Sequence, residues 1–111
     1  MYTSVVYYSG ELRTESTHLQ SGETYITDAP TDNEGKGEAF SPTDLIATGL
    51  ANCILTIMGI VARRKSLTIE GTKAEVTKIM GKDPRRIGEI KIDFFFSRSY
   101  DEDSKKLLKH A

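Results

Sequence analysis

Hydrophobic and polar positions along the first 28 residues follow the pattern of a small sheet. Residues 3–9 are rich in β-branched and aromatic side chains, and Ser9-Gly10 is a turn signal. Residues 11–19 resume an extended pattern, and a second turn at Ser21-Gly22 leads into a third strand-like segment at 23–28. The sequence therefore predicts an N-terminal three-stranded sheet.

A polar segment, residues 29–39, follows the predicted sheet. Its density of Pro, Gly, Asn and Asp is typical of a loop. At about 11 residues it exceeds the usual connection length of roughly 4 to 6, which favours a functional role.

The best-defined boundary is the start of a long helix. Ser41 can cap a helix, Pro42 suits its first position, and Asp44 occupies the place of a capping-box residue. Residues 45–62 are apolar on almost every side. We expect a buried helix over about 42–64.

The rest of the chain predicts a second hairpin and a short helix. Residues 67–80 and 87–97 are strand-like, and Ile90, Ile92, Phe94 and Phe96 alternate onto one face of the second strand. A helix begins at Asp101, and it has no stop signal before Ala111. We therefore expect a C-terminal helix that is cut short and a chain that lacks the last part of its fold.

The predicted long helix needs more cover than these elements supply. A helix that is apolar all round must be covered on all sides, whereas one sheet and one hairpin cover at most two. Small residues on this helix would let a second helix approach closely, and these are Ala47, Thr48, Gly49, Ala51 and Asn52. Two-fold pairing of the helix in a homodimer is the simplest solution.

Length and charge narrow the class of protein. The chain has 111 residues, which suits a single domain, 1–111. Fifteen Lys and Arg residues against sixteen Asp and Glu residues give a net charge of −1, so the large basic surface of a nucleic-acid binder is absent. We expect no nucleic-acid partner.

The single cysteine and the N-terminal sequence indicate in which cellular compartment the protein works and whether it binds a cofactor. Cys53 has no second cysteine for an intramolecular disulfide, and His18 and His110 do not complete a zinc motif with it. The N-terminus lacks the features of a secretory signal, and polar residues interrupt the long apolar stretch. We expect a cytoplasmic protein with no metal, no bound cofactor and no membrane partner.

Cys53 is the residue best placed to carry chemistry, although a buried cysteine often serves only as core packing. One turn before it stands Gly49, which leaves a hollow beside the thiol. A reactive thiol must be a thiolate, and a nearby cation favours that form. Four residues could supply the cation, namely Arg13, Lys36, Arg63 and Arg64.

Four segments of the chain resemble the OsmC/Ohr family of osmotically inducible and organic hydroperoxide resistance proteins. These segments are residues 12–22, 26–65, 75–80 and 83–94, and within them a Pro precedes a Cys by about ten positions in SPTDLIATGLANC. The resemblance implies an OsmC-like α+β fold, an intertwined homodimer, and thiol peroxidase sites at the subunit interface.

The resemblance also assigns roles to individual residues. Cys53 matches the peroxidatic cysteine and Arg13 the arginine that stabilises its thiolate. The family's glutamate falls on Thr43, with Asp44 next to it as the candidate carboxylate for orienting the arginine. The family's resolving cysteine would lie beyond Ala111.

The leading hypothesis is a peroxidase that reduces organic hydroperoxides through Cys53 and Arg13 and is recycled by an external dithiol. One alternative is a non-catalytic dimeric module that binds a small apolar ligand near Gly49. A second is an inactive, truncated fragment of the peroxidase.

Overall fold

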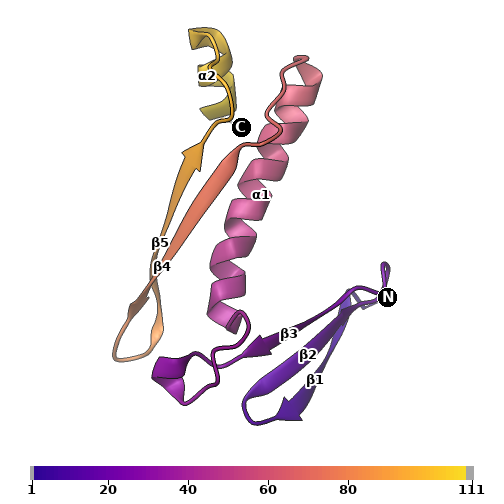
Figure 1. The fold of residues 1–111 in the computed structure, drawn as a ribbon, viewed down its shortest axis with the longest axis vertical. Coiled ribbons are helices and arrows are strands. Elements are labelled where there is room, and N and C mark those ends of the chain that lie inside the picture. The colour runs from indigo at the N-terminus through magenta and orange to yellow at the C-terminus, as the bar shows by residue number, and fades with distance from the viewer. Residues whose placement is uncertain (1, 110–111) are drawn as a thin grey trace. The chain divides into compact units, whose positions relative to one another are not determined.

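The computed structural model describes residues 2–109, and the chain divides after Leu45 into two compact units. The first contains the three N-terminal strands and the polar loop, and the second contains most of the long helix, a hairpin and the last helix (Figure 1).

The first unit is built on an antiparallel sheet with the strand order β1-β2-β3. These strands span Ser4–Gly10, Arg13–His18 and Thr24–Asp28. The turn between β1 and β2 holds Glu11 and Leu12 at φ values of 55° and 63°. The predicted three-stranded sheet is confirmed.

The polar loop after β3 folds back onto this hairpin. It contains a 3-10 turn at Thr31–Asn33. The Ala29 amide donates to the Leu12 carbonyl, and the Gly37 amide donates to the Ala29 carbonyl. At Gly35 a Cβ atom would lie 1.7 Å from the Ala29 carbonyl oxygen, so only glycine fits there.

The long helix α1 spans Pro42–Arg64, which confirms the predicted bounds. It begins with a capping box in which the Asp44 amide donates to Ser41 Oγ over 3.1 Å. In return the Ser41 amide donates to Asp44 Oδ2 over 3.0 Å. Pro42, which has no amide hydrogen, occupies the first position.

The second unit contains an antiparallel hairpin and a short helix. Strands β4 (Lys73–Gly81) and β5 (Arg86–Phe95) pair along their whole length, and α2 spans Glu102–Lys109. The predicted hairpin is confirmed, but its first strand begins six residues later than expected, because residues 67–72 form an irregular segment with a turn at 70–71. The expected end of the last helix lies outside the described residues.

The core of the second unit lies where α1, β5 and α2 meet. Its buried members are Met58, Ala62 and Leu108, and Phe94 and Tyr100 are among the partly buried side chains packed on them. The Tyr100 hydroxyl donates to the Thr68 carbonyl over 2.5 Å, which fastens the segment before α2 to the turn after α1.

Much of α1 is not covered within one chain, as expected for a helix that needs more cover than one chain's sheet and hairpin supply. Ile46, Leu50, Ile57 and Ile60 are 61%, 44%, 41% and 47% exposed. We call these four residues the exposed stripe. The hairpin and α2 pack against only one side of α1. By length and composition alone α1 is long and apolar enough to cross a bilayer, a test that core helices of soluble proteins also pass.

Candidate functional site

The first cluster of charged side chains is centred on Arg13, at the start of β2. Arg13 pairs in the sheet register with Asp28, the last residue of β3. Its Nε atom donates to Asp28 Oδ1 over 2.6 Å, and its Nη2 atom donates to Asp28 Oδ2 over 2.8 Å. This two-point pairing fixes the plane of the guanidinium.

A second carboxylate approaches the same guanidinium from the polar loop. Glu38 Oε1 accepts a hydrogen bond from Arg13 Nη2 over 2.9 Å. The Glu38 amide donates to Asp28 Oδ2 over 3.2 Å, so Asp28 holds both the arginine and the loop. Nearby, Lys36 Nζ lies 2.6 Å from Glu11 Oε2 and ties the loop to the β1-β2 turn.

These contacts control the protonation of the cluster. The Arg13 guanidinium holds the pKa of the Asp28 carboxyl below its usual value, chiefly through hydrogen bonding and also through charge attraction, while burial opposes the shift. The same hydrogen bonds raise the pKa of Arg13. The Glu11 carboxylate raises the pKa of Lys36 in the same way. Arg13, Asp28 and Lys36 are therefore ionised at neutral pH.

Asp44 caps the start of α1, whereas the resemblance to the family predicted that it orients the arginine. Its carboxylate and amide both bond to Ser41 in the capping box. The carboxylates bonded to Arg13 are instead those of Asp28 and Glu38. Asp44 therefore caps α1, and a role for it in orienting Arg13 stays a prediction.

Cys53 is exposed on α1, in the second unit. Together with the exposed stripe it forms a series at positions 46, 50, 53, 57 and 60, with steps of three or four residues. That spacing places all five side chains on one face of the helix. Gly49 lies one turn before Cys53, and a Cβ atom there would meet no atom within 4 Å apart from the neighbouring backbone of its own helix. The thiol is therefore open to a substrate or to a second protein chain.

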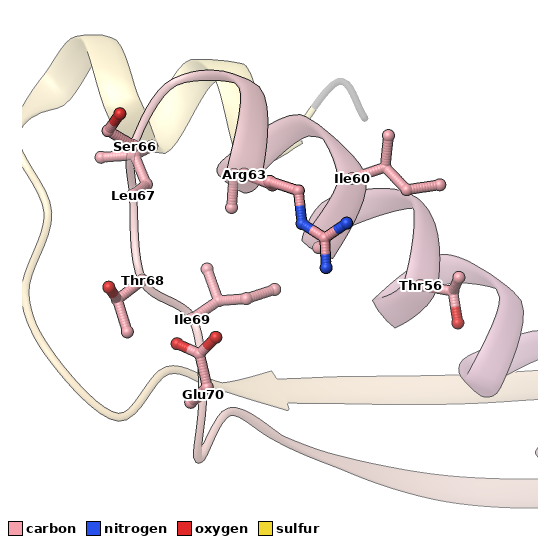
Figure 2. Close-up of a pocket in the computed structure, with 10 residues that line it drawn as sticks. Thr56, Ile60, Arg63, Ser66, Leu67, Thr68, Ile69 and Glu70 are labelled. Atoms are coloured by element: carbon pink, nitrogen blue, oxygen red, sulfur yellow. The ribbon is translucent and has the colours of Figure 1, made fainter.

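Two of the cavities in the second unit are lined in part by α1. One, of about 530 Å³, lies between the last turns of α1 and residues 66–70, and Thr56, Ile60 and Arg63 stand on its helical side (Figure 2). The other, of about 950 Å³, is lined by α1, β5 and α2. Its apolar members include Ile54, Met58, Phe94, Phe96 and Leu108. Among residues 2–109, no group of three or more His, Cys, Asp or Glu side chains is placed to hold a metal ion.

Asp28 and Glu38 were not singled out from the sequence. Asp28 could have been found from the strand register, because an Asp at the end of β3 faces the Arg at the start of β2. Glu38 reaches Arg13 only through the fold of the loop, which a pattern of residue types does not reveal.

The comparisons with known proteins decide the family. A family model described as OsmC-like protein matches residues 35–111. The chain belongs to the OsmC-like protein family. No curated protein sequence matches it.

Solved structures agree with this assignment. One of them is the crystal structure of a protein from Psychrobacter arcticus 273-4 that is described as an osmotic stress induced and detoxification response protein. Its sequence is 55% identical to this chain, and the two structures superpose with a TM-score of 0.96. The match covers 99% of this chain and 80% of that chain. The family's mixed α+β fold, with a three-stranded sheet, a long helix, a hairpin and a short helix, is therefore the fold of this protein.

More distant structures share the fold alone. An OsmC-like protein of unknown function from Vibrio cholerae is 11% identical, with a TM-score of 0.76 and coverage of 96% of this chain and 84% of that chain. An organic hydroperoxide resistance protein OsmC from Legionella pneumophila is 16% identical, with a TM-score of 0.67 and coverage of 98% and 81%.

Proposed function

We propose that this OsmC-like protein is a thiol peroxidase that reduces organic hydroperoxides, with Cys53 as the nucleophile and Arg13 as its cationic partner. The observation that carries the proposal is the exposure of Cys53 in the middle of an apolar helix face. Cys53 does not pack in the core of its own chain, and an apolar face beside the thiol suits the organic part of a hydroperoxide.

The oxidation step needs only the thiol and the hydroperoxide. The Cys53 thiolate attacks the terminal oxygen of R–O–OH, an S–O bond forms and the O–O bond breaks. The sulfur becomes a sulfenic acid, and the alkoxide takes a proton and leaves as the alcohol. An external dithiol then reduces the sulfenic acid, giving water and a disulfide of the reductant.

The cationic partner would act through its fixed geometry. A nearby positive charge favours the thiolate over the thiol. The bonds from Nε and Nη2 of Arg13 to Asp28 hold the guanidinium, while its Nη1 amine makes no hydrogen bond within residues 2–109. Nη1 is therefore available to a thiolate or to a peroxide oxygen.

The proposed assembly is a homodimer formed through α1. The exposed stripe has the alternating three- and four-residue spacing of a helix seam. A second copy would cover these side chains and Cys53's neighbours, as the apolar character of the helix requires. We further propose that the protein works in the cytoplasm, where dithiols are maintained in their reduced form.

A second candidate function is the binding of a small apolar ligand without catalysis. The cavity of about 950 Å³ favours it, because its size lies at the upper end of known ligand sites and its lining is largely apolar.

Peroxide consumption separates the two functions. Cumene hydroperoxide should be consumed in the presence of excess dithiothreitol by the wild-type protein and not by Cys53→Ser. The matched control is Ser97→Ala, which lies in the same unit and removes only the hydrogen bond to the Glu70 carbonyl. Equal, background-level consumption by all three proteins would reject the peroxidase and leave the binding module.

A further inference from the structure

The cavity of about 530 Å³ in the second unit brings opposite charges to one space. Arg63 lies in the last turn of α1, and Glu70 lies in the segment that follows this helix. Figure 2 shows the guanidinium of Arg63 and the carboxylate of Glu70 on opposite sides of the cavity, with the Ile69 side chain between them. Within residues 2–109 neither charged side chain makes an ion pair. Both charges are therefore available to a ligand.

The backbone that leads to Glu70 is held to the rest of the second unit. At the end of α1 the Leu67 amide donates to the Ala62 carbonyl over 2.8 Å. The Tyr100 hydroxyl donates to the Thr68 carbonyl. This wall of the cavity is already ordered without a ligand, so binding does not have to supply the free energy of ordering it.

Apolar side chains line much of the remaining cavity. Ile60, Leu67 and Ile69 are among them, and Leu67 and Ile69 also pack on the core of the unit. Among the described lining residues, Arg63 is the only cation and Glu70 the only anion. The volume and the mixture of apolar surface with a few polar groups are typical of a small-molecule site.

The cavity is distinct from the surface around Cys53. Arg63 follows Cys53 by ten residues, which corresponds to about 15 Å along a helix. At about 100° per residue, the lining positions Thr56, Gly59 and Arg63 are turned by roughly 60 to 120° from Cys53 around the helix axis. The cavity therefore flanks the exposed stripe, and Ile60 is the residue that the two share.

We propose that this cavity binds a small zwitterion with an apolar side chain, of the class of the free aliphatic α-amino acids. The ligand's carboxylate accepts hydrogen bonds from the guanidinium of Arg63, whose planar fork matches a carboxylate. The ligand's ammonium group donates to the Glu70 carboxylate, and its side chain packs on Leu67 and Ile69. This site goes beyond the proposed function and does not depend on the chemistry of Cys53.

The first test is isothermal titration calorimetry of the 111-residue chain with three compounds of similar shape. L-leucine carries both charges, 4-methylpentanoate lacks the ammonium group, and 3-methylbutylamine lacks the carboxylate. L-leucine should bind at least about tenfold more tightly than either analogue, because each analogue leaves one charged group of the cavity without a partner. Absence of L-leucine binding, or binding of either analogue as tight as that of L-leucine, would overturn the inference.

The second test removes the charges of the cavity one at a time. Arg63→Gln and Glu70→Gln should each weaken L-leucine binding by about tenfold. Arg64→Gln and Glu89→Gln are the matched controls, because they remove exposed charges of the same unit that do not line the cavity, and both should bind like wild type. An affinity for L-leucine that is unchanged in Arg63→Gln or in Glu70→Gln would contradict the assigned contacts.

The third test fills the cavity and leaves both charges in place. Gly59 lines the cavity, and a Cβ atom there would meet no atom within 4 Å apart from the neighbouring backbone of its own helix. Gly59→Leu should therefore abolish L-leucine binding, while the higher helix propensity of Leu keeps α1 folded, as circular dichroism would show. Unchanged binding in a folded Gly59→Leu protein would place the ligand elsewhere and overturn the inference.

Discussion

The guanidinium of Arg13 donates two hydrogen bonds to the fully buried carboxylate of Asp28, with N–O distances of 2.6 and 2.8 Å. The two residues are register partners on neighbouring strands, so the pair is built by the sheet itself. A guanidinium held at two points by a buried carboxylate keeps one orientation.

Asp28→Asn should lower the free energy of unfolding at neutral pH. It should also make that free energy depend less on pH in the acidic range. In the folded protein Arg13 depresses the pKa of Asp28, so the pair stabilises the fold above the unfolded pKa of about 4. This contribution is lost as the pH falls through the folded pKa. Urea unfolding of both proteins at pH 7 and pH 3 should therefore show a larger difference at pH 7.

A difference between the two proteins that is the same at pH 7 and pH 3 would contradict this linkage. Glu38→Gln provides the comparison, because the Glu38 side chain is largely exposed and makes one hydrogen bond. The free energy of unfolding should fall less in Glu38→Gln than in Asp28→Asn.

The elements whose limits depend on local interactions could be predicted from the sequence. The start of α1 follows from Ser41, Pro42 and Asp44, which interact within one turn. The segment 67–72 could not be predicted in the same way. Leu67 and Ile69 alternate as in a strand, but they pack against the core beside α1, and Gly71 turns the chain with a φ of 88°.

The candidate site could be predicted only in part. The positions of Cys53 and Arg13 in the sequence carried the resemblance to the family, whereas Asp28 and Glu38 are joined to Arg13 by tertiary contacts. The incomplete cover of α1 within one chain could be predicted, because the helix is apolar on almost every side and the other elements are too few to cover it. Its burial against a second chain stays a prediction.

Ser41→Ala should lower the free energy of unfolding by about 1 kcal/mol, because the Asp44 amide loses its cap. Asp44→Ala should have a similar effect through the Ser41 amide. The two losses should not add in the double variant, since the bonds form one capping box. Full additivity in chemical unfolding would show that Asp44 acts outside the box.

Leu108→Ala should destabilise the second unit by about 3 kcal/mol, because Leu108 is 1% exposed and packs on Met58 and Ala62. Leu12→Ala is a suitable control, since Leu12 is 44% exposed. Thermal unfolding followed by circular dichroism measures both. A loss for Leu108→Ala no greater than for the control would contradict the packing of α2 on α1.

Leu50→Glu and Ile57→Glu should dissociate the proposed dimer. Each places a charge in the exposed stripe, which the proposed assembly buries. Thr77→Glu adds the same charge at an exposed position of β4 and should leave the dimer intact. Light scattering should give about twice 12.3 kDa for wild type and control, and one chain mass for the two stripe variants. A wild-type monomer at micromolar concentration would contradict the assembly.

The measurement that tests the central claim most directly is the trapping of oxidised Cys53. Reduced protein is treated with one equivalent of cumene hydroperoxide in the presence of dimedone, and the tryptic peptides are analysed by mass spectrometry. The account predicts one dimedone adduct, on the peptide that contains Cys53, formed more slowly in Arg13→Ala. A Cys53 that keeps its mass and alkylates no faster than an unactivated exposed cysteine would contradict it.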